Sequence, residues 1–180
     1  SLLQSFLFIK DGPLAFFGQT ANLHKPMREL MTYVSQNHSL YLVGIEKSGP
    51  FVEHAIEINN RLKSNHVLIL NNEYIYKYII PGNAEEAEPY GRTTYYGNKI
   101  IYKSHDHHVY VATLPTNTTL TNPCKTDFYG LDIICKNLAR LKCDSYDSAL
   151  IPVALANKLV SLSNRPSATI LGKFARNQIE

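Results

Sequence analysis

Asp11 occupies the position in this sequence that best suits chemistry. It follows the apolar run 5–10 and precedes Gly12-Pro13, which is a strong turn signal. Open α/β sheets place reactive groups at the carboxyl ends of their strands, and hard divalent cations prefer oxygen ligands such as this carboxylate. The alternative is an aspartate that only begins a turn, because turns use aspartate often.

A second apolar run, residues 40–46, ends in Glu46 and is followed by Lys47-Ser48. If this run lies parallel to the first, Lys47 ends near Asp11, and its ammonium can contact a scissile phosphate. Side chains alternate along a strand, so Glu46 and Lys47 are expected on opposite faces, with Glu46 at most an outer carboxylate. A solvated lysine at a strand end is the alternative reading of Lys47.

Cations and aromatic rings alternate further along the chain, where Arg92, Tyr96 and Lys99 are candidate nucleic-acid-binding residues. This pattern is typical of a groove in which bases stack and phosphates pair, and equally of a half-exposed strand. The nearby tetrad 105–108 contains three histidines, and imidazole suits Zn²⁺. At most two of these rings share a face of a strand, so a polar hairpin turn is the preferred prediction.

The elements that position these residues follow from periodicity and turn signals. Helical spacing over 21–37 lies between the runs 5–10 and 40–46, which predicts a strand–helix–strand unit with a parallel pair and a right-handed crossover. Other expected elements are a helix over 51–62, a strand over 66–70, a polar loop over 81–93, a β-hairpin from 94–103 and 109–114, and helices over 129–143, 147–163 and 167–178. Residues 73–80 could form either a helix or a strand.

Composition indicates one globular domain over residues 1–180. The chain is 44% hydrophobic and 18% charged, which is neither disordered nor membrane-spanning composition. A net charge of +3 does not by itself argue for nucleic acid. Three cysteines without a CxxC pair suggest reduced thiols in a cytoplasmic protein rather than disulfides or zinc. The chain begins at Ser1 and enters an apolar run at once, so we expect an N-terminally incomplete domain.

Four segments, in the same order, resemble the NurA nuclease family. Residues 8–15, Phe-Ile-Lys-Asp-Gly-Pro-Leu-Ala, look like its second acidic motif. Residues 42–48, the stretch 95–99 with the hairpin after it, and the late helix over 146–163 are similar to the segments that follow in that family. The similarity covers most of the chain, and its specificity comes from the order of the motifs.

The resemblance implies an α/β fold with an RNase H-like mixed sheet, flanked by helices and carrying an inserted β-hairpin. It also implies a hydrolase, namely a Mn²⁺- or Mg²⁺-dependent DNA nuclease, with Asp11 as a metal ligand. The family acts as a homodimer with a HerA-like hexameric ATPase, in DNA repair by end resection or in defence against foreign DNA. No membrane association is expected.

This sequence departs from the family pattern at two places. The first acidic motif, Asp-Gly-Ser, has no counterpart, and the late-helix position where the family tends to have histidine reads Asn157. Asparagine can coordinate a metal through its carbonyl oxygen but cannot act as an acid or base. Two-metal hydrolysis needs several carboxylates, so the chain alone is expected to be inactive. A catalytically incomplete adaptor that binds DNA or the ATPase is the alternative, and an unrelated α/β enzyme is a third reading.

Overall fold

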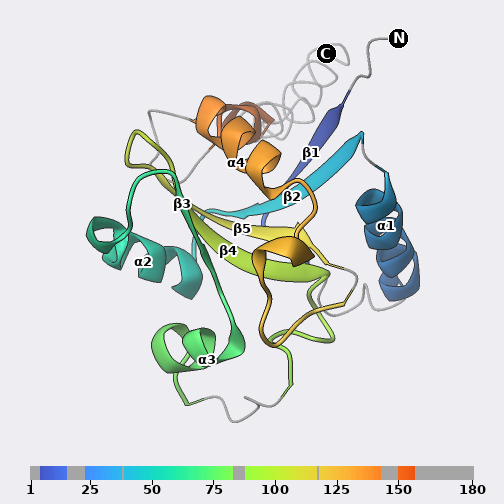
Figure 1. Cartoon of the computed structure of the whole chain (residues 1–180), viewed down its shortest axis with the longest axis horizontal. Coiled ribbons are helices and arrows are strands. Elements are labelled where there is room, and N and C mark those ends of the chain that lie inside the picture. Colours follow the sequence, from blue (N-terminus) through green and yellow to red (C-terminus); the bar gives the residue numbers. More distant parts are fainter. Residues whose placement is uncertain are drawn as a thin grey trace, which may run out of the picture.

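The computed structural model describes residues 5–15, 23–37, 39–82, 88–116, 118–142 and 150–156. This part of the chain is an α/β structure in which helices flank a five-stranded mixed sheet (Figure 1). The strands are β1 (Phe6–Asp11), β2 (Leu40–Glu46), β3 (His66–Ile69), β4 (Gly97–Lys103) and β5 (Val109–Pro115). The helices are α1 (His24–Gln36), α2 (Pro50–Glu57), η2 (Asn59–Arg61), α3 (Asn72–Tyr74), η3 (Ile75–Ile79), η4 (Lys125–Asp127) and α4 (Leu131–Arg140).

The strands are ordered β1-β2-β5-β4-β3 across the sheet. β1 and β2 are parallel, with register from Phe6 opposite Leu40 to Asp11 opposite Ile45, and α1 connects them. The expected strand–helix–strand unit is therefore confirmed. The other three pairings are antiparallel. Because β1 and β2 are parallel, their carboxyl ends lie side by side at the same end of the sheet, where Asp11 lies.

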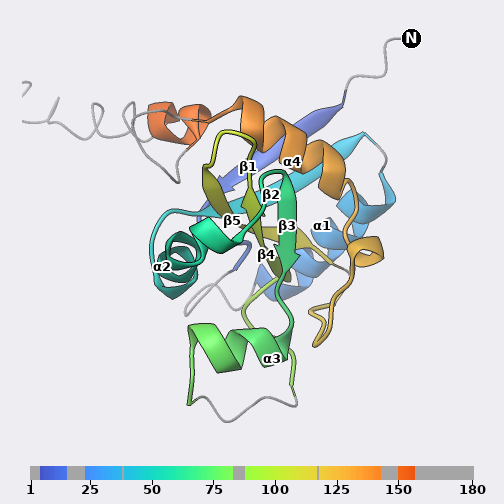
Figure 2. The same ribbon diagram turned by 60° about the vertical axis from the view of Figure 1, so that its left-hand side comes forward.

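Each face of the sheet has its own hydrophobic core. On one face, α4 packs over alternate residues of β2, β4 and β5, including Val43, Ile100 and Ala112. On the other face, α2 covers Ile101 and Val111, while α1 packs through Met31 on Leu14 and Tyr96. Figure 2 shows the sheet between α4 on one side and α1 and α2 on the other. Because both faces are covered, every residue of the central strands β4 and β5 is buried.

Several element predictions need correction. The hairpin is not an insertion, because β4 and β5 are central strands of the sheet. The predicted helix over 51–62 ends at Glu57 and continues as the 3₁₀ turn η2. The segment 73–80 is helical, with a π-helical turn over Ile75–Ile79, and the Asn71 side chain caps its start by accepting from the Tyr74 N–H. The predicted helix over 129–143 is α4, Leu131–Arg140. Of the predicted helix over 147–163, residues 151–156 are helical, whereas 147–149, 157–163 and the predicted helix over 167–178 lie outside the described residues.

The described residues include no helix that is both long enough and apolar enough to cross a lipid bilayer.

Candidate functional site

The candidate site lies where β1 and β2 end side by side. Asp11 is the last residue of β1, and Lys47 directly follows the last residue of β2. The Lys47 Nζ atom is 2.9 Å from the Asp11 Oδ2 atom, and the two side chains are 35% and 42% exposed. Exposed pairs of this kind add little to stability. The pair therefore matters for its chemistry, since it presents a carboxylate and an ammonium together at the surface.

A tight turn fixes the direction of the chain after Asp11. Gly12 has a φ of +88°, a backbone conformation that favours glycine, and its N–H donates to the Ile45 carbonyl oxygen at 2.8 Å. The Lys10 ammonium donates to the Pro13 carbonyl oxygen at 2.8 Å. Burial lowers the pKa of Lys10, although the neighbouring Asp11 carboxylate opposes this effect. The turn is thus tied to both strands of the parallel pair.

Gly44 makes room for this turn. A Cβ atom at Gly44 would lie 2.5 Å from the Leu14 nitrogen and 2.7 Å from the Gly12 oxygen. Both are backbone atoms of the turn, which consequently crosses directly over β2. A glycine inside an apolar strand is a recognised sign of close backbone approach, so the sequence contained this signal.

Three residues, Lys47-Ser48-Gly49, connect β2 to α2. The loop Lys47-Ser48-Gly49 leads into α2, with Gly49 at a φ of +98° and Pro50 in the first turn of the helix. Lys47 is therefore held between the end of a central strand and the start of a packed helix.

Glu46 points to the opposite face from Lys47, as strand alternation predicts, and pairs with Lys99. The two side chains are 10% and 2% exposed. The Lys99 Nζ atom also lies 4.4 Å from the ring centres of both Phe51 and Tyr95. Lys99 was predicted to bind nucleic acid, but the structure places its ammonium inside the protein.

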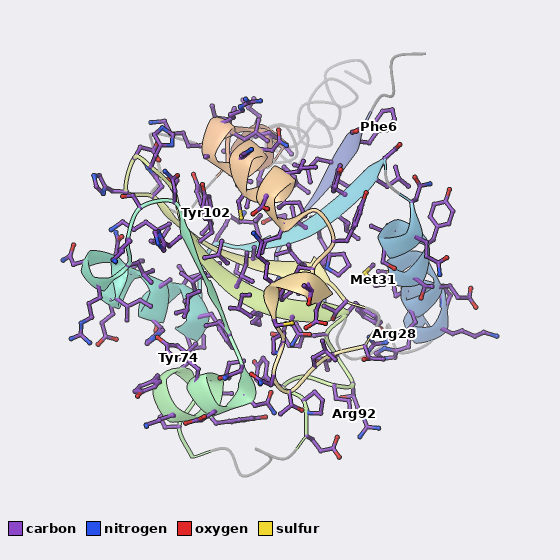
Figure 3. All side chains as sticks on the ribbon, in the orientation of Figure 1. Phe6, Arg28, Met31, Tyr74, Arg92 and Tyr102 are labelled. Atoms are coloured by element: carbon purple, nitrogen blue, oxygen red, sulfur yellow. The ribbon has the colours of Figure 1, made fainter. Side chains whose placement is uncertain are left out.

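Of the three predicted nucleic-acid contacts near residue 95, Arg92 is at the surface and Tyr96 is buried. The Tyr96 hydroxyl is hydrogen-bonded to the Nδ1 atom of His24, and the Arg28 guanidinium lies 4.9 Å from the Tyr96 ring centre. The exposed Arg92 side chain pairs with Glu88, and its carbonyl oxygen accepts from Arg28 at 3.1 Å (Figure 3). The structure does not gather Arg92, Tyr96 and Lys99 into one exposed surface.

The turn that contains the three histidines is held by contacts with other residues of the protein. Asp106 accepts a hydrogen bond from the Ser104 hydroxyl and pairs with the Lys142 ammonium at 2.8 Å. This arrangement agrees with the preferred prediction of a polar hairpin turn. Asn157 lies outside the described residues.

The described residues do not form a metal centre by themselves. Within those ranges, no group of three or more His, Cys, Asp or Glu side chains is close enough to hold an ion. Of the two carboxylates that end β1 and β2, Glu46 is bound to Lys99 on the opposite face, and the Oδ2 atom of Asp11 is bound to Lys47. One carboxylate does not meet the requirement of a two-metal hydrolytic site.

Sequence reasoning missed the buried Glu46–Lys99 pair. The register places Lys99 opposite Thr113 on β5, and Thr113 opposite Gly44 on β2. Lys99 therefore reaches across β5 to Glu46 at the end of β2. Only the order of strands in the sheet reveals this relation, because the two residues are 53 positions apart in the chain.

Comparison of the chain with family models, curated proteins and solved structures found no match.

Proposed function

We propose that this chain is a NurA-like domain with an RNase H-like fold, and that it serves a metal-dependent DNA nuclease. The observation that supports the proposal best is the 2.9 Å pair of Asp11 and Lys47 at the carboxyl ends of two parallel strands. This is the edge of an α/β sheet where reactive groups are usually placed. The order of the sequence motifs around Asp11 and Lys47 provides the link to NurA.

The two residues have separate roles in this proposal. Asp11 contributes one carboxylate ligand toward Mn²⁺ or Mg²⁺, which prefer oxygen donors. Lys47 contributes an ammonium that pairs with a DNA phosphate as a point charge. Further carboxylates have to come from residues that the structure does not describe or from a second chain, as in the proposed homodimer. A HerA-like hexameric ATPase is the proposed partner, with DNA end processing or defence as the process.

A second function is favoured by the same geometry. Because Asp11 belongs to no group of three or more potential metal ligands among the described residues and binds Lys47, the domain also fits an adaptor that binds DNA or the ATPase without cutting. The two functions differ in whether the Asp11 carboxylate is required for hydrolysis.

The deciding experiment measures Mn²⁺-dependent degradation of linear single- and double-stranded DNA by the full-length protein, with and without a HerA-type partner. We expect Asp11→Ala to lower the rate at least about 100-fold, since it removes a ligand of the ion that stabilises charge in the reaction. The fold should persist, because the Asp11–Lys47 pair is exposed.

Asp132→Ala is the matched control. Asp132 is also an exposed aspartate in a surface ion pair, 3.2 Å from Lys125, but it lies on α4. Its replacement should leave the degradation rate within about twofold of wild type, as is usual for surface changes away from a site. If wild type and Asp11→Ala show the same absence of cleavage with the partner present, the adaptor function replaces the nuclease. Equal cleavage by both would leave Asp11 as a turn residue.

A further inference from the structure

The residues on either side of the loop that carries Lys47 both contact the same buried lysine, Lys99. On the N-terminal side, Glu46 directly precedes Lys47 and binds the Lys99 ammonium. On the C-terminal side, Phe51 lies in the first turn of α2, and its ring centre is 4.4 Å from the same ammonium. The loop Lys47-Ser48-Gly49 is the short connection between these two contacts.

The surroundings of Lys99 make this contact costly to lose. Its side chain is 2% exposed, and Tyr95 stands at 4.4 Å as a second aromatic wall. Burial lowers the pKa of Lys99, while the Glu46 carboxylate opposes the effect by favouring the charged form. A buried charge that loses its partner is strongly destabilising, whereas a pair replaced by apolar side chains is often neutral. In some proteins, such pairs specify a conformation more than they add stability.

We propose that Lys99 is a positioning residue that acts through Glu46 and Phe51 to hold the Lys47 loop in the geometry of the Asp11–Lys47 pair. The role in catalysis rests on the function proposed above, whereas the effect on the loop does not. Lys99 itself touches neither DNA nor the reacting atoms, since its ammonium is enclosed by protein. The pair spans β5, so it also couples the end of β2 to the start of β4.

The test replaces both charges together, as Glu46→Met with Lys99→Met. Methionine is unbranched and adaptable, so the double variant should keep the core filled while removing the directed bond. Lys103→Met is the matched control, because Lys103 is a second buried lysine on β4, and its ammonium donates to the Asn59 carbonyl oxygen at 2.7 Å. Lys103 is four residues along the same face, beyond the end of α2.

Two quantities are measured on the full-length protein. The first is the ¹⁵N order parameter of the backbone amides of Lys47, Ser48 and Gly49, which does not depend on activity. We expect order parameters of about 0.85 in wild type and in Lys103→Met, and a fall to about 0.6 in the double variant. The second is DNA cleavage, where the double variant should lose about 10- to 100-fold in kcat with a smaller change in KM, since a small misplacement has this effect.

Each outcome decides the question. Unchanged order parameters in the folded double variant would overturn the proposal, and so would an equal fall in Lys103→Met, which would indicate general destabilisation. If wild type does not cleave DNA, the proposed nuclease function is wrong, but the order parameters still test whether Lys99 holds the Lys47 loop. If the double variant does not fold, Phe51→Leu removes one aromatic wall while keeping an apolar core residue, and the same loss of order is expected from it.

Discussion

A side chain does not fit at Gly44, because backbone atoms of the turn after β1 lie directly against this residue. We expect Gly44→Ala to lower the free energy of unfolding by about 3 kcal/mol, since the Cβ would meet immobile backbone 2.5 Å away at Leu14. Gly82→Ala is the control: its Cβ would meet nothing within 4 Å, and its φ of +89° alone should cost about 1 kcal/mol. Urea unfolding measures both. Equal losses would show that the turn moves aside easily.

Single residues also show what the sequence could and could not establish. The opposite directions of Glu46 and Lys47 follow from strand alternation, and so does the approach of Lys47 to Asp11 once the strands are parallel. The burial of Lys99 does not follow, because β4 is covered on both faces and has no polar side to guide the prediction. A lysine in the sequence suggests an exposed side chain, whereas the strands and helices packed around β4 determine that Lys99 is buried.

The hairpin between β4 and β5 is tied at its turn to Lys142, two residues beyond the end of α4. Burial opposes ionisation of Asp106, but hydrogen bonds from Lys142 and Ser104 outweigh it and lower the pKa of this carboxyl. A carboxyl whose pKa is lowered by folding contributes stability above its unfolded pKa of about 3.9, and loses that contribution as the pH falls through its folded pKa. The contact between the two elements should therefore be sensitive to acid.

Asp106→Asn tests this connection. At neutral pH we expect the variant to lose about 1–2 kcal/mol of unfolding free energy, because a hydrogen-bonded charge is removed. The difference from wild type should stay constant above about pH 5 and shrink below about pH 4. Chemical unfolding across this pH range measures it. Asp132→Asn, at an exposed pair on α4, should change stability by under about 0.5 kcal/mol. A constant difference down to pH 2 would contradict the assignment to Asp106.

Element types were predicted best where the apolar period and the turn signals agree. The run 40–46 matches β2 in both bounds, and 5–10 matches β1 to within one residue at each end. The sequence does not distinguish helix from strand over 73–80, because the aromatic and β-branched residues there suit a strand, while the cap from Asn71 favours a helix. The hairpin was predicted as an insertion, because local sequence does not state which strands a hairpin joins.

At the scale of the whole molecule, β1 forms an edge of the sheet. Among the described residues, β1 pairs with β2 alone, so its other side presents N–H and C=O groups without a strand partner there. Phe6 and Phe8 project from one face of this strand and are 51% and 54% exposed, with Phe6 seen at the outer end of β1 in Figure 3. Exposed apolar edge strands favour pairing with another chain.

This arrangement predicts that self-association depends on β1. We expect Phe6→Thr with Phe8→Thr to reduce association of the full-length protein, measured by sedimentation over a tenfold range of concentration. Threonine keeps the preference for a strand, so the free energy of unfolding should change by under about 0.5 kcal/mol. Ile133→Thr removes an apolar side chain of comparable exposure from α4 and should leave association unchanged. Association of the double variant at wild-type concentrations would show that the β1 edge does not drive it, and Ile133→Thr acting equally would point to general surface hydrophobicity instead.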